Sequence, residues 1–189
     1  TPFHVRSRRS ICIPMKHLIA IFFACLMAGQ AAANCVVLLH GLARTEASFA
    51  LMETALEAEG FTIVRPGYPS TKATIPELAD NTIPQAVADC PIGPLHFVTH
   101  SMSGILVRDW LNRNRPTNLG RVVMLAPPNQ GSEVIDTFGG LYLFDQINGP
   151  AALQLGTGEQ SLPLALPAVD YPVGVIAGNQ SLNVYLSAI

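Results

Sequence analysis

The most informative stretch of this sequence reads FVTHSMSG, from Phe97 to Gly104. Residues 95–99 predict a strand, and residues 101–111 predict a helix that starts directly after it. A serine at such a junction is most often an ordinary helix N-cap. The position also suits a nucleophile elbow, in which small residues two before and two after the serine let strand and helix approach closely. Thr99 and Ser103 hold those two places here.

Predicted strands and helices alternate on both sides of this stretch. The predicted strands cover residues 35–40, 61–64, 95–99, 121–126 and 173–177, and the predicted helices cover residues 45–59, 74–89 and 101–111. Between residues 129 and 172 the pattern weakens, and we expect one or two short helices. Strands that alternate with helices predict an α/β fold, with an open, mostly parallel sheet and helices on both faces.

The length and composition exclude several classes of protein. A chain of 189 residues is long enough for one domain with a sizeable core, and 49% hydrophobic against 13% charged residues argues against disorder. The chain has only four cysteines and is too long for a small domain held together mainly by disulfides. Its net charge of -2 gives no reason to expect a nucleic-acid partner.

The N-terminal segment differs from the rest. Met15 opens a short basic start, an apolar run follows over residues 18–28, and small residues end at Ala33, an order typical of a secretory signal peptide. The run is shorter than the roughly 20 residues that span a bilayer as a helix. We therefore predict a signal peptide at residues 15–33 and a secreted or periplasmic protein, with a membrane anchor formed by an uncleaved signal as the alternative. Residues 1–14 are predicted to be an upstream artefact or a disordered segment.

A second motif, His40-Gly41-Leu42, follows the first predicted strand. The functional crevice of an open parallel sheet lies outside the carboxyl ends of its strands, so this loop and the Ser101 turn should converge there. A developing oxyanion needs two backbone N–H donors, and the candidates are those of Leu42 and Met102. His40 is either a structural histidine that closes the strand or a residue that shapes this loop.

Three segments together resemble the α/β-hydrolase superfamily, and within it secreted bacterial serine esterases and lipases with a His-Ser-Met-Gly-Gly elbow. They are residues 38–42 (LLHGL), 97–108 (FVTHSMSGILVR) and 122–132 (VVMLAPPNQGS). The resemblance covers residues 35–132 well and 173–183 loosely. It implies Ser101 as the nucleophile and Leu42 and Met102 as oxyanion donors. The supporting residues in the same motifs are His40, Gly41, His100 and Gly104. Ser103 departs from the family, which usually has glycine at that place.

The resemblance leaves the catalytic acid and base unassigned. The family order is serine, then acid, then histidine, whereas all five histidines of this chain precede Ser101. His100 adjoins Ser101, but neighbouring side chains diverge in such a turn, so it is not assigned as the base. We expect the α/β-hydrolase domain, residues 34–189, to be incomplete at its C-terminus, with the acid and the histidine in the missing part.

Cys35 and Cys90 are the cysteines that remain after the predicted signal, and in an oxidising compartment they invite pairing. In the fold that the resemblance implies, both lie at the amino end of adjacent strands, which favours a disulfide. Two cysteines without nearby partner ligands make a poor zinc site, so no metal site is predicted.

These observations predict a serine hydrolase that cleaves carboxylic esters through an acyl-enzyme at Ser101, without a cofactor. The resemblance implies small-molecule or lipid esters as substrates, with transient contact to a membrane or lipid surface as an option. The apolar stretch 138–144 is expected to be a core helix, or else part of a lid or acyl pocket. The alternatives are a catalytically inactive binding module with the same truncated fold and an acyltransferase that uses the same serine.

Overall fold

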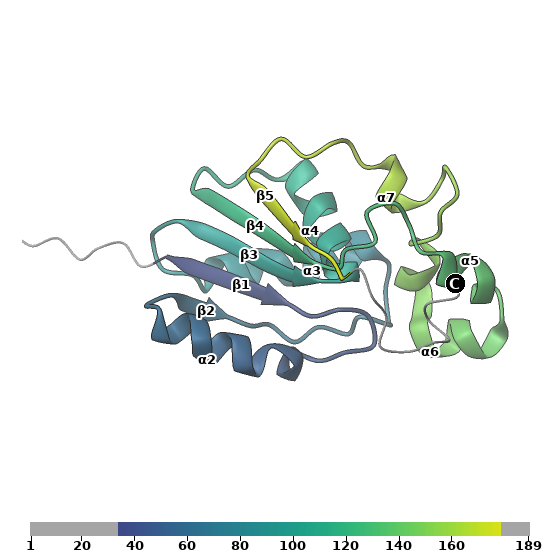
Figure 1. Cartoon of the computed structure of the whole chain (residues 1–189), viewed down its shortest axis with the longest axis horizontal. Coiled ribbons are helices and arrows are strands. Elements are labelled where there is room, and N and C mark those ends of the chain that lie inside the picture. The colour runs from purple at the N-terminus through teal and green to yellow at the C-terminus, as the bar shows by residue number, and fades with distance from the viewer. Residues whose placement is uncertain (1–33, 179–189) are drawn as a thin grey trace, which may run out of the picture. The chain divides into compact units, whose positions relative to one another are not determined.

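Parallel strands form one five-stranded sheet in the part of the chain that the computed structural model describes, residues 34–178 (Figure 1). The strands are β1 (Cys35–Leu39), β2 (Thr62–Val64), β3 (Leu95–His100), β4 (Leu119–Leu125) and β5 (Val173–Ile176). Their order in the sheet is β2-β1-β3-β4-β5, and every neighbouring pair is parallel. The predicted open parallel sheet is therefore confirmed. Residues 1–14, the predicted signal peptide at 15–33 and residues 179–189 lie outside the described residues.

Helices cover both faces of the sheet, as predicted. The short 3-10 helix η1 (Glu46–Phe49) and α2 (Ala50–Ala58) pack on one face, where Phe49 joins apolar residues of β1. On the other face, α3 (Ile75–Ala88) and α4 (Met102–Arg113) enclose the larger hydrophobic core (Figure 1). β1 lies inside the sheet, and all five of its side chains are buried, which explains its uninterrupted apolar sequence.

The strand that leads to Ser101 has one fully buried face. Leu95, Phe97 and Thr99 are buried, and they alternate with the half-buried residues His96, Val98 and His100. Side chains alternate between the two faces of a strand, so the first three point to the core under α3 and α4. This packing holds the end of β3 in place where the chain turns toward α4.

Residues 129–172 contain more helix than the sequence predicts. Three helices form in this region: α5 (Glu133–Phe138), α6 (Tyr142–Leu153) and α7 (Leu162–Ala165). The expected one or two short helices are too few. Within α6, Gly149 has a non-helical φ of 70° and Pro150 follows it, so a kink separates two helical segments there. α5 and α6 lie beyond the carboxyl ends of the strands (Figure 1).

The stretch 138–144 is not a core helix, so that prediction is wrong. It spans the end of α5, a turn and the start of α6, and Tyr142 and Leu143 are 76% and 73% exposed. Ala151, Ala152 and Leu155 supply the buried contacts of this region instead. The apolar side chains at the start of α6 therefore face outward.

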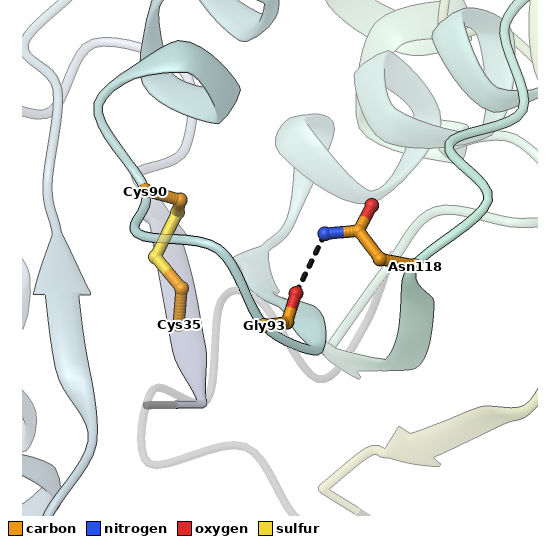
Figure 2. The surroundings of a disulfide bond; sticks show 4 residues. All are labelled: Cys35, Cys90, Gly93 and Asn118. Carbon is orange, nitrogen blue, oxygen red and sulfur yellow. Dashed lines mark hydrogen bonds between the residues drawn. A yellow bond between two sulfur atoms is a disulfide. The ribbon is translucent and has the colours of Figure 1, made fainter. Parts of the chain in front are cut away.

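A disulfide joins Cys35 to Cys90, which confirms the predicted pairing (Figure 2). It links the first residue of β1 to the segment between α3 and β3, with the two Cα atoms 5.7 Å apart. In the same region the Asn118 side-chain amide donates a hydrogen bond to the Gly93 carbonyl at 2.6 Å (Figure 2). Both links lie at the amino end of the sheet.

Within residues 34–178, none of the helices combines the length and the apolar character that crossing a bilayer requires.

Candidate active site

Ser101 occupies the turn between β3 and α4 in a conformation that few non-glycine residues adopt. Its φ is 56° and its ψ is -125°. Its N–H donates to the Leu125 carbonyl at 2.8 Å, which anchors the turn to the end of β4. Although Ser101 directly precedes the helix, its side chain makes no capping hydrogen bond. The ordinary N-cap interpretation therefore does not describe this serine. Such strained positions cost about 1–3 kcal/mol and concentrate at functional sites.

Gly104 shows why the turn needs a small residue. A Cβ placed there would lie 3.0 Å from Cβ of Pro127 and 3.4 Å from Oγ1 of Thr99. The first turn of α4 thus rests directly on β3 and on the loop that follows β4. This close approach is the packing that a nucleophile elbow requires.

The loop of residues 40–44, which we call the oxyanion loop, lies against Ser101. A Cβ placed at Gly41 would lie 3.3 Å from Cβ of Ser101 and 3.1 Å from the His100 carbonyl oxygen. The predicted convergence of the two loops at the carboxyl end of the sheet is therefore present. Neither the Leu42 nor the Met102 N–H has a hydrogen-bond acceptor within residues 34–178. Both backbone N–H groups therefore lack a partner in the described part of the chain.

His40 shapes the oxyanion loop from within the protein. Its ring is buried and stacks on the Tyr68 ring, with the centroids 4.1 Å apart, and Nδ1 lies 2.9 Å from the Gly41 carbonyl oxygen. The Tyr68 hydroxyl donates to the His40 carbonyl. These contacts are compatible with both roles that the sequence left open for His40, closing the strand and shaping the loop.

Two residues that hold this loop were not identified from the sequence. Tyr68 packs on His40, and the Ser70 hydroxyl accepts a hydrogen bond from the Ala43 N–H at 3.0 Å. Both belong to the segment after β2, 27 and 28 residues further along the chain than their partners. No local pattern marks them, because their role depends on a contact between two loops.

The His100 ring lies beside Gly41, where an added Cβ would be 2.9 Å from its Nδ1. With Arg44, Phe49 and Leu125 it lines a groove of about 680 Å³ on the α2 side of the sheet. Burial and the nearby charge of Arg44 lower the pKa of His100, which favours the neutral ring. No hydrogen bond joins His100 to the Ser101 side chain within residues 34–178. The divergence of the two side chains stays a prediction.

Four of the six acids that follow Ser101 in the sequence have partners away from the serine. Asp109 pairs with Arg113 at 2.6 Å and Asp170 with Arg115 at 2.6 Å. Asp136 accepts from Thr157, and Asp145 accepts from the Gly140 N–H. Across residues 34–178, no hydrogen bond links a carboxylate to a histidine, so no acid–histidine pair forms there.

Asn129 stands in the loop that follows β4. Its Oδ1 accepts a hydrogen bond from the Arg108 guanidinium at 3.0 Å. Arg108 also donates to the Leu166 and Pro167 carbonyls, both at 3.3 Å, and therefore ties α4 to the segment before β5. Burial lowers the pKa of Arg108. Asn129 thus has a structural partner.

Comparisons with known proteins find similarity in structure alone. No protein-family model matches this chain, and no curated protein sequence matches it. Phospholipase PlaB from Legionella pneumophila is 22% identical with a TM-score of 0.58, over 77% of this chain and 38% of PlaB. In its complex with thio-NAD, PlaB gives a TM-score of 0.60. A metagenomic carboxyl esterase is 23% identical with a TM-score of 0.60, over 78% of this chain and 50% of the esterase. The chain thus spans half or less of these proteins.

Proposed function

We propose, from the premise that this chain has the α/β-hydrolase fold, that it carries the nucleophile and the oxyanion site of a serine hydrolase for carboxylic esters. The observation that carries the proposal is the conformation of Ser101, which turns through a positive φ directly beside Gly41. Acyl transfer needs a strained serine near backbone N–H groups that can bind an oxyanion, and the Leu42 and Met102 N–H groups have no partner among residues 34–178.

In the proposed reaction, Oγ of Ser101 attacks the ester carbonyl carbon. The carbonyl oxygen becomes an oxyanion, and the N–H groups of Leu42 and Met102 donate hydrogen bonds to it. The alcohol then leaves with a proton, and water hydrolyses the acyl-enzyme to release the acid and free the serine. The serine proton must pass to a base, and the described residues assign neither that base nor its acid partner.

Exposed apolar side chains near the carboxyl end of the sheet support an apolar ester as substrate. Tyr142, Leu143 and Ile147 are 76%, 73% and 64% exposed, and they belong to α6, beyond the strand ends (Figure 1). The similar proteins are a phospholipase and a carboxyl esterase by name. We propose small-molecule or lipid esters as the substrate class. Secretion or a periplasmic location follows from the sequence of residues 15–33 and is part of the proposal.

The test is labelling of the protein produced from its complete gene with a fluorophosphonate probe, which reacts with activated serines. We expect one labelled peptide that contains Ser101, and we expect Ser101→Ala to abolish the label. A folded protein whose Ser101 does not react would overturn the proposed hydrolase and favour the non-catalytic binding module. If Ser101 reacts with the probe, a separate unlabelled sample is incubated with an ester and an excess of a second alcohol. This separates hydrolysis from acyl transfer, because only an acyltransferase forms the new ester as its main product.

A further inference from the structure

We infer that Ser103 is a positioning residue that holds the oxyanion loop in register with Ser101. The inference rests on the proposed function, since it assigns Ser103 a role in presenting the two oxyanion donors. It concerns the residue at which this chain departs from the usual glycine of the elbow.

The Ser103 hydroxyl joins the ends of two strands. It is fully buried in the first turn of α4. Its Oγ donates to the Leu39 carbonyl at 2.6 Å and accepts from the His100 N–H at 2.8 Å. The His100 carbonyl oxygen is a further neighbour at 3.0 Å. A hydroxyl both donates and accepts, so one group serves both strands, which neither glycine nor alanine can do.

The position of these contacts connects them to the site. Leu39 is the last residue of β1, and His100 is the last residue of β3. Leu39 pairs with Thr99 at the end of the β1–β3 ladder, so the hydroxyl sits where the two strands part. The oxyanion loop leaves from the first strand end, and Ser101 leaves from the second. Ser103 therefore sets the spacing between the two chain segments that carry the donors.

The oxyanion loop and the Ser101 turn are closely packed. An added Cβ at Gly41 would lie 3.3 Å from Cβ of Ser101, so the loop and the serine already approach closely. A displacement of about 1 Å between reacting groups can cost on the order of 100-fold in rate. A bond that fixes this spacing should therefore affect the reactivity of Ser101 and not only stability.

The burial of Ser103 excludes a role as nucleophile, but it leaves a purely structural role to be separated from positioning. A structural hydroxyl would only satisfy the buried His100 N–H and Leu39 carbonyl, and its loss would lower stability without changing the reactivity of the folded protein. A positioning hydroxyl also changes reactivity and the order of the oxyanion loop. The two roles therefore differ in measurements made on folded protein.

The experiment compares Ser103→Ala and Ser103→Gly with the wild type in the protein produced from its complete gene. The matched control is Thr82→Ala, which removes a buried hydroxyl from α3 away from the elbow. Two quantities are measured on folded protein: the second-order rate of fluorophosphonate labelling, and hydrogen exchange at the Ala43 and Arg44 amides, whose hydrogen bonds fold the loop.

We expect both Ser103 variants to label about 10- to 100-fold more slowly than wild type and to exchange faster in the oxyanion loop, while Thr82→Ala changes neither. Unchanged labelling and exchange in the Ser103 variants would overturn the positioning role. If the wild type itself does not label, the proposed function fails and the exchange measurement decides alone: faster loop exchange supports the positioning role, and unchanged exchange overturns it. Ser103→Gly keeps the test available if the alanine variant does not fold.

Discussion

Removal of the Cys35–Cys90 disulfide should destabilise the fold strongly without reaching the site. The bond closes a loop between residues 55 positions apart. In the chain-entropy model a cross-link over a loop of this size removes about 14 cal/mol/K from the unfolded chain, which is about 4 kcal/mol at 25 °C. The perturbation is the double variant Cys35→Ala, Cys90→Ala, with the reduced wild-type protein as an independent way to break the same bond.

The assay is urea unfolding of the oxidised wild type, the reduced wild type and the double variant. With a urea m-value of about 2 kcal/mol/M, a loss of 4 kcal/mol lowers the midpoint by about 2 M. The two ways of breaking the bond should agree, because both remove the same constraint from the unfolded chain.

Ser101 should keep its reactivity in the folded reduced protein. The disulfide lies at the amino end of the sheet and Ser101 follows the carboxyl end of β3. Strands rise about 3.3 Å per residue, so Ser101, six positions after Leu95 at the start of β3, lies roughly 20 Å from that end of the strand. A stability loss below about 1 kcal/mol in both forms, or loss of labelling while the protein is still folded, would refute this reasoning.

Two further perturbations test the loop and the sheet. Gly41→Ala should lower the rate of Ser101 labelling at least 10-fold, because the added Cβ would lie 3.3 Å from Cβ of Ser101. The control Gly158→Ala should not change the rate, because its Cβ would meet no atom within 4 Å. Equal labelling rates for the two variants would contradict the close approach of Gly41 to Ser101. Burial and the charge of Arg121 lower the pKa of His96, and its Nδ1 accepts the Arg121 N–H at 2.9 Å. The folded protein therefore binds this proton less readily than the unfolded chain, so unfolding free energy should be unaffected above a pH of about 6.5 and fall below it. His96→Gln, which keeps an acceptor without the charge, should flatten this fall in urea unfolding between pH 8 and pH 5, and an unchanged slope would contradict the assignment.

Local patterns in the sequence identified most of the elements of the fold. The uninterrupted apolar run at residues 35–40 corresponds to β1, which is buried on both faces. Thr74 and Glu77 form a capping box at the start of α3, where the sequence predicts a helix from residue 74. These signals were readable because strand alternation, apolar runs and helix caps depend on residues only a few positions apart.

The region after β4 was predicted less well, because its structure depends on residues that are neighbours in space and not in the sequence. An apolar run such as 138–144 suits a core helix or a surface segment equally, and only its neighbours in space distinguish the two. Ala151 and Leu155 are buried in the described fold and occupy the core beside α3, so the start of α6 is left exposed. The sequence pattern does not indicate which of these segments is buried.

The sequence by itself determined the order of strands and helices, the place of Ser101 between β3 and α4, and the motif that brings Gly41 to the same end of the sheet. Only the tertiary structure decided how these parts meet. Ser103 and the Leu39 carbonyl, which share a hydrogen bond, are 64 residues apart. The Ser101 turn is anchored to the end of β4, and Tyr68 supports His40 from a third segment. Such contacts follow from the packing of the whole sheet, because residues distant in the chain become neighbours only when the strands align.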